Sequence, residues 1–121
     1  MADPECSTVA VVGDGGIGMY FSDLRIAVEK RLPILVLFFT DGGYGSIQAV
    51  AESKGLDLNL ASIKASSWAS SLKSLGMDGT VAHSLEEISE YLTIWDQGSG
   101  PLFVECRFDQ DKYRHMVDTI R

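Results

Sequence analysis

The chain has 121 residues, of which 45% are hydrophobic and 22% charged, which is typical of one globular domain. Its net charge of −7 argues against a nucleic-acid surface, because phosphate backbones require a basic face. No apolar run is long enough to cross a bilayer, and the first five residues lack the basic and apolar regions of a secretory signal, so we expect a cytoplasmic protein without a membrane partner.

Segments of strand and helix character alternate along the chain. A β-branched run over 8–12 predicts the first strand, and an apolar run over 34–39 predicts a strand buried on both faces. The segment between them is predicted to be helical and to end at Pro33. The other predicted elements are a helix over 47–54, a helix ended by Gly76, a strand over 80–83, a helix opened by a Ser84–Glu87 capping box, a strand over 102–106 and a terminal helix.

Each of four predicted helices has an apolar face that is expected to point toward a sheet. These faces are Phe21, Leu24, Val28 and Leu32; Ala65, Trp68, Leu72 and Leu75; Leu85, Ile88, Leu92 and Trp95; and Tyr113, Met116, Val117 and Ile120.

The alternation of strands and helices predicts an α/β fold, with a parallel sheet, helices on both faces and right-handed crossovers. We expect a single domain over 1–121. Ligands of such sheets bind at the carboxyl ends of the strands. Two consecutive predicted strands end in the most glycine-rich segments, Gly13-Asp-Gly-Gly-Ile-Gly18 and Asp41-Gly-Gly-Tyr-Gly45, so the functional site is expected there.

The first glycine-rich segment permits two interpretations. Gly13, Gly15 and Gly18 satisfy the dinucleotide fingerprint G-x-G-x-x-G, and Asp41 follows about 20 residues later, where a ribose-binding acid is expected. However, Asp14 lies inside this turn, where its carboxylate would repel a pyrophosphate. Magnesium removes that repulsion, because the ion binds one or two carboxylates together with phosphate oxygens.

The two segments and their spacing resemble the thiamine-diphosphate motif, in which Gly-Asp-Gly is followed, after a spacer, by a pair of asparagines. The run Leu-Pro-Ile-Leu-Val-Leu, followed by Gly-Gly-Tyr-Gly-Ser-Ile, is most similar to the acetolactate synthase, pyruvate decarboxylase and benzoylformate decarboxylase group. The resemblance continues through Gly100-Pro-Leu-Phe-Val-Glu105 and implies a diphosphate-binding domain. The implied chemistry makes or breaks a bond beside the carbonyl of a 2-keto acid.

The resemblance assigns roles to individual residues. Asp14, Asp41 and the backbone carbonyl of Gly43 match the family's magnesium ligands. The amides of Gly15 and Gly16 match those that meet the diphosphate. The remaining residues assigned to the cofactor site are Gly13, Tyr44 and Gly45, with Ile47 and Gln48 where family members project side chains toward the thiazolium.

Two departures from the family motif affect this assignment. Thr40-Asp41 replaces the pair of asparagines, and aspartate is at least as good a magnesium ligand as asparagine. Gln48 occupies a position that is glutamate in some family decarboxylases, which makes proton donation from it doubtful. Tyr44 could either pack under its loop or lie near the cofactor.

The resemblance also implies parts that this sequence lacks. The family domain begins upstream with a further glycine-rich segment, so the domain is expected to be incomplete at its N-terminus. A pyrimidine-binding domain or subunit is the expected partner, because it supplies the glutamate that activates the cofactor, and we expect a homo-oligomer. The isolated chain is therefore expected to be inactive. The alternatives are a nicotinamide-nucleotide-binding domain and a truncated or split subunit without catalysis.

Other side chains with chemical potential have simpler explanations. His83 lies at a predicted strand end and His115 in a charged terminal segment, and both are expected to be solvated or hydrogen-bonded without a catalytic role. Trp68 and Trp95 are on apolar helix faces, which predicts core packing.

Overall fold

The computed structural model describes residues 6–63, 67–95 and 100–109. Its four strands are all parallel and form one sheet in the order β1-β2-β4-β3. The strands are β1 (Thr8–Gly13), β2 (Ile34–Thr40), β3 (Asp78–Ala82) and β4 (Leu102–Arg107). The predicted α/β class is therefore confirmed. The predicted terminal helix, Ala65 and His115 lie outside the described residues.

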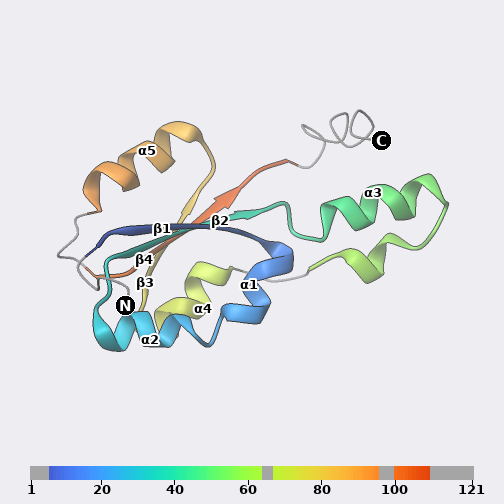
Figure 1. Ribbon diagram of the computed structural model, residues 1–121. Coiled ribbons are helices and arrows are strands. Elements are labelled where there is room, and N and C mark those ends of the chain that lie inside the picture. The colour runs from blue at the N-terminus through green and yellow to red at the C-terminus, as the bar shows by residue number, and fades with distance from the viewer. Residues whose placement is uncertain (1–5, 64–66, 96–99, 110–121) are drawn as a thin grey trace.

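Helices cover both faces of the sheet (Figure 1). Helices α1 (Asp14–Tyr20), α2 (Leu24–Lys30) and α4 (Trp68–Ser74) lie on one face, and α5 (Leu85–Ile94) lies on the other. Helix α3 (Gly45–Ser53) and the 3₁₀ helix η1 (Leu58–Ala61) pack against each other and extend beyond the carboxyl end of β2. The connection after β2 therefore projects from the end of the sheet where a ligand is expected.

The core forms two layers, because successive side chains of a strand point to opposite faces. On one face, Phe38 and Phe103 stack with ring centroids 5.6 Å apart, and Trp68 meets Phe38 edge-on at 5.8 Å. On the other face, Leu35 and Val104 are fully buried beneath α5. Strands β2 and β4 lie in the middle of the sheet, and the burial on both faces predicted for 34–39 is found along β2 except at Phe39, which is 37% exposed.

The helix predicted before Pro33 is divided into two short helices. Helix α1 already begins at Asp14, and α2 ends at a cap residue, Arg31, with a left-handed φ of 49°. Leu32 then donates its N–H back to the carbonyl of Ala27 (3.0 Å), which satisfies a free carbonyl at the helix end. Leu32 therefore follows the helix and does not extend its face.

The buried face of α5 also differs from the prediction. Leu85 and Leu92 are 75% and 42% exposed, whereas Ile88, Tyr91 and Trp95 pack on the sheet. The main contacts of α5 are with β3 and β4, and the side of the helix that carries Ile88 and Tyr91 is the side that is covered. The predicted capping box is present in part: the Ser84 hydroxyl accepts the N–H of Glu87 at 3.2 Å, but the Glu87 carboxylate accepts the N–H of His83 at 2.8 Å, one residue before the cap.

Smaller differences concern the ends of elements. Strand β3 begins two residues before the predicted start, and α3 begins at Gly45. The 3₁₀ helix η1 was not predicted. Gly76 follows α4 with a φ of 85°, which confirms it as the helix terminator. Among the described residues, no helix has both the length and the apolar character required to cross a membrane.

Candidate functional site

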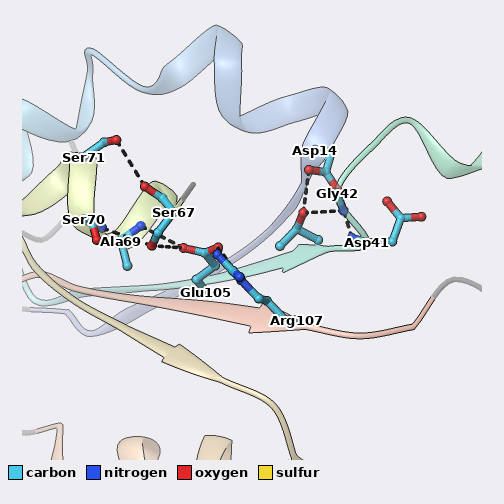
Figure 2. A network of polar contacts seen from close by, with 10 residues as sticks. Asp14, Asp41, Gly42, Ser67, Ala69, Ser70, Ser71, Glu105 and Arg107 are labelled. Atoms are coloured by element: carbon cyan, nitrogen blue, oxygen red, sulfur yellow. Dashed lines mark hydrogen bonds and ion pairs between the residues drawn. The ribbon is translucent and has the colours of Figure 1, made fainter. Parts of the chain in front are cut away.

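The sheet register brings the two aspartates together at the carboxyl ends of β1 and β2. Gly13 pairs with Phe39, so the next residues, Asp14 and Thr40, leave the sheet side by side. Asp14 Oδ1 accepts a hydrogen bond from the Thr40 hydroxyl at 2.7 Å, and Oδ2 accepts the N–H of Asp41 at 3.3 Å. Figure 2 shows this cluster beside the end of β2. Adjacent parallel strands thus place both predicted carboxylates in one site.

Thr40 connects the two loops. Its hydroxyl donates to Asp14 and its oxygen accepts the N–H of Gly42 at 3.0 Å, and the residue is only 6% exposed. Sequence reasoning treated Thr40 only as a departure from the family motif. The signal that could have identified it is a hydroxyl at the last position of an apolar strand, immediately before a predicted metal ligand.

The turn after β2 depends on two glycines for different reasons. Asp41 Oδ1 accepts the N–H of Gly43 at 3.0 Å, which forms a tight turn around Gly42. Gly42 has a φ of 85°, a conformation that favours glycine. At Gly43 the restriction is space, because an added Cβ would lie 2.7 Å from the carbonyl oxygen of Ala61 and would overlap Gln48 Nε2. The carbonyl of Gly43 is thus held in a crowded turn beside Asp41.

The electrostatics of the cluster suit a bound cation. Burial raises the pKa of Asp14, the hydrogen bond from Thr40 partly opposes this, and the negative charge of Asp41 adds to the rise. A divalent cation would offset both the burial and the repulsion. Within the described residues no three His, Cys, Asp or Glu side chains cluster as a complete metal site. Two carboxylates and a carbonyl are instead the partial oxygen set that fits magnesium bound together with phosphate oxygens.

The other predicted cofactor residues surround this cluster. Gly15 and Gly16 form the first turn of α1, where backbone N–H groups have no partner within the helix. A Cβ on Gly16 would meet nothing within 4 Å, so the fold itself leaves open space there. The ring of Tyr44, which is 40% exposed, lies 4.0 Å from the Cβ position of Gly15. Tyr44 thus lies beside the first glycine segment.

The two residues predicted to project toward the thiazolium behave differently. Ile47 is 56% exposed on α3. Gln48 is buried, and its Nε2 donates to the carbonyl of Ala61 at 3.1 Å and to the hydroxyl of Ser62 at 3.2 Å. The Gln48 carboxamide is thus engaged between α3 and η1, which differs from the expected orientation.

A second polar cluster, which sequence reasoning did not identify, lies at the end of β4 (Figure 2). Glu105 is 1% exposed, and its Oε2 accepts the Ser67 hydroxyl at 2.8 Å and the N–H of Ala69 at 2.9 Å. Its Oε1 pairs with Arg107 at 2.8 Å. Burial alone would raise the pKa of Glu105, but these donors outweigh it and lower the pKa. A charged residue within the apolar strand Phe-Val-Glu-Cys was the available signal.

A cavity of about 200 Å³ lies between the two polar clusters. Its lining includes Thr40, Asp41 and Gly42 from the first cluster, and Glu105 and Arg107 from the second. The ends of β2 and β4 therefore share one cavity beside Asp41, with Ile63, Trp68 and Phe108 as its apolar lining.

Comparisons with known proteins identify the family of the chain. Residues 1–106 match the family model of the thiamine pyrophosphate enzyme C-terminal TPP binding domain. The chain is 30% identical over 89 residues to "Putative thiamine pyrophosphate-containing protein YdaP" of Bacillus subtilis (strain 168), an alignment that covers 74% of this chain and 16% of that protein.

Solved structures share the fold. The thiamine diphosphate-dependent 4-hydroxybenzoylformate decarboxylase of Rhodococcus jostii RHA1 superposes with a TM-score of 0.77, and the benzoylformate decarboxylase of Polynucleobacter necessarius with 0.74. Each is 16% identical, covering 88% of this chain and 20% of the other. The chain thus spans a fifth or less of the length of these relatives. Because the family model covers most of the sequence, the chain belongs to the thiamine pyrophosphate enzyme family, with the fold of its C-terminal TPP binding domain.

Proposed function

We propose that this chain binds the diphosphate of thiamine diphosphate through Mg²⁺, as the cofactor-binding part of a 2-keto-acid decarboxylase or carboligase similar to acetolactate synthase. The observation that carries the proposal is the convergence of Asp14 and Asp41. The Asp14 carboxylate accepts hydrogen bonds from the Thr40 hydroxyl and from the backbone N–H of Asp41. Asp14 and Asp41 are both half-buried, and burial together with the charge of Asp41 raises the pKa of Asp14, so a cation at this end of the sheet would stabilise the ionised pair.

Each residue has a defined part in this proposal. The carboxylates of Asp14 and Asp41 and the carbonyl of Gly43 hold the ion, and the N–H groups of Gly15 and Gly16 contact the diphosphate. The bound cofactor supplies an electron sink for cleavage beside a keto group. The chain's own contribution is to position the diphosphate and to balance its charge.

The proposal includes a partner. The chain corresponds to 16–20% of the length of its relatives, so a complete active site draws on further protein. We propose that a pyrimidine-binding domain, in the same parent chain or in another subunit, supplies the group that activates the cofactor. A homo-oligomer and a 2-keto-acid substrate belong to the same proposal, and the chain alone is inactive.

The test is a calorimetric titration of the chain with thiamine diphosphate, with and without Mg²⁺. Binding that requires Mg²⁺ and is lost in Asp14→Ala, with an unchanged circular dichroism spectrum, is the expected result. Asp78→Ala is the matched control, because this exposed aspartate begins β3 at the opposite end of the sheet. Unchanged affinity in Asp14→Ala would overturn the metal assignment. Binding of NAD in place of thiamine diphosphate would support the dinucleotide alternative, and binding of neither would support the non-catalytic subunit.

A further inference from the structure

The turn that carries Gly43 is held by a second segment of chain. The N–H of Tyr44 donates to the carbonyl of Ala61 at 2.8 Å, and the N–H of Ile63 donates to the carbonyl of Gly42 at 2.8 Å. Between these two bonds, Gly43 and Ser62 form an antiparallel bridge. Residues 61–63, at the end of η1 and just after it, therefore clamp the turn along one edge, about 20 residues away in sequence.

Gln48 fills the space inside this clamp. Its Nε2 donates to Ala61 O, the same carbonyl that accepts Tyr44 N–H, and to the hydroxyl of Ser62. The carboxamide also lies directly against Gly43, since a Cβ added there would overlap Nε2 and lie 3.1 Å from Cδ. One buried amide thus contacts the turn and two of the three residues that clamp it, Ala61 and Ser62.

The chemistry of the amide fits this place. Ala61 O and the Ser62 hydroxyl oxygen both accept hydrogen bonds from Gln48, so the side chain at this position must be a donor. The Ser62 hydroxyl cannot donate to it, because its own proton goes to Leu58 O at 3.2 Å. A glutamate at this position would present an acceptor to two acceptors when ionised. A glutamine therefore satisfies the clamp where the isosteric acid would not.

We propose that Gln48 is a positioning residue that fixes the peptide of Gly43, so that its carbonyl is oriented for the metal ion. The inference rests on the proposed function, in which that carbonyl is a ligand. Gln48 acts through Ala61, Ser62 and contact with Gly43, and it touches neither metal nor substrate. Residues that orient metal ligands typically change metal affinity by about 10- to 100-fold when they are replaced.

The experiment compares Gln48→Met with the parent chain. Methionine keeps the length and flexibility of the side chain but donates no hydrogen bond. The Mg²⁺ affinity, titrated at fixed thiamine diphosphate, is expected to fall about tenfold or more. At saturating Mg²⁺ the cofactor affinity is expected to recover to within about threefold, because the N–H groups of Gly15 and Gly16 belong to α1. A general loss of structure would weaken both affinities together and would not recover.

The matched control is Ser84→Ala, which removes the cap of α5 and lowers stability far from the turn. Its Mg²⁺ affinity is expected to equal that of the parent. Amide hydrogen exchange adds a second readout. The N–H groups of Tyr44 and Ile63 are expected to exchange faster in Gln48→Met than in the parent chain, and at the parent's rate in Ser84→Ala.

The outcomes separate the two proposals. If the parent chain binds no Mg²⁺ with the cofactor, the proposed function fails, and the role of Gln48 fails with it. If the parent binds Mg²⁺ and Gln48→Met binds it within twofold of the parent, the positioning role alone is overturned. An equal loss of Mg²⁺ affinity in Ser84→Ala would also overturn it, because the effect would then report stability.

Discussion

Thr40 is buried between the loops that follow β1 and β2, and its hydroxyl serves both of them. Replacement by valine, which has the same shape, would remove the donor to Asp14 and the acceptor for Gly42 N–H. A buried group left without its partner costs about 1–3 kcal/mol of unfolding free energy. The pKa of Asp14 is already raised by burial, with Asp41 adding to the rise, and loss of the Thr40 donor would raise it further.

Thr40→Val is therefore expected to weaken Mg²⁺ binding most at low pH. The ion binds the ionised carboxylate, so a higher pKa of Asp14 lets protons compete at a higher pH. Calorimetric Mg²⁺ titrations at a series of pH values should show the affinity of the variant falling earlier as pH decreases. Thr40→Ser keeps the hydroxyl and should follow the parent. If the Mg²⁺ affinity of Thr40→Val falls with pH in parallel with that of the parent, this role of the hydrogen bond is contradicted.

Asp41 allows a test between the two interpretations of the glycine segments. As a magnesium ligand it should tolerate Asp41→Asn, since that side chain keeps an oxygen ligand and matches the family's usual residue, whereas Asp41→Leu should abolish Mg²⁺-dependent binding. As a ribose-binding acid, Asp41→Asn would instead weaken NAD binding. Titration of both variants with both cofactors provides the comparison. Loss of Mg²⁺-dependent binding in Asp41→Asn would contradict the ligand assignment.

At the scale of elements, Glu105 connects β4 to the amino end of α4. Because its pKa in the folded state is lowered below the ordinary 4.5, its contribution stabilises the fold above that pH and is lost as pH falls through the folded pKa. Glu105→Gln is expected to reduce the unfolding free energy at pH 7 by about 1–3 kcal/mol, since the ionic partner of Arg107 is lost. The difference from the parent should shrink below about pH 4.5.

Urea denaturation at a series of pH values from about 3 to about 7 measures the difference in unfolding free energy between Glu105→Gln and the parent. The control is Glu29→Gln, which removes an exposed pair with Arg25 whose side chains are 54% and 70% exposed. That change should cost about 0.5 kcal/mol or less. A pH-independent loss in Glu105→Gln would show that packing, and not charge, accounts for its effect.

The elements that the sequence predicted well are those with local causes. The run over 34–39 and the terminator Gly76 depend on neighbouring residues alone, and both were found in the expected places. The break between α1 and α2 was missed, because one apolar face continues from Phe21 into α2 despite it. The buried stripe of α5 was misjudged, since only tertiary contact reveals which side of the helix faces the sheet.

The residues of the site also fall into those that a local pattern predicts and those that it does not. Asp14 and Asp41 were predictable because each follows a strand and adjacent parallel strands end at the same edge. The bond between Thr40 and Asp14 spans 26 residues, the bond between Gln48 and Ala61 spans 13, and the bond between Glu105 and Ser67 spans 38. No local pattern encodes such pairings.

At the scale of the molecule, β1 forms an apolar edge of the sheet. Val9 and Val11 are 53% and 68% exposed, and their pairing with Leu35 and Leu37 places them on the face that carries α5. Phe39, on the same face of β2, is 37% exposed. Helix α5 contacts β3 and β4, so the β1 side of this face is open. Exposed apolar edge strands favour association with another chain.

The isolated chain is therefore expected to associate with itself and to lack activity until a pyrimidine-binding domain is supplied. Light scattering should give a mass above that of a monomer. Val11→Lys should lower the mass, because a charge on an edge strand opposes pairing. Ile26→Lys, on the exposed side of α2, is the matched control and should not lower it.

Activity is measured as decarboxylation of 2-keto acids with saturating thiamine diphosphate and Mg²⁺. No turnover is expected from the chain alone, because the group that activates the cofactor belongs to the proposed partner domain. Turnover should appear when a pyrimidine-binding domain of the family is added, and Asp14→Ala should prevent it. Robust turnover by a monomeric chain would contradict the split site, since it would place every activating group within these 121 residues.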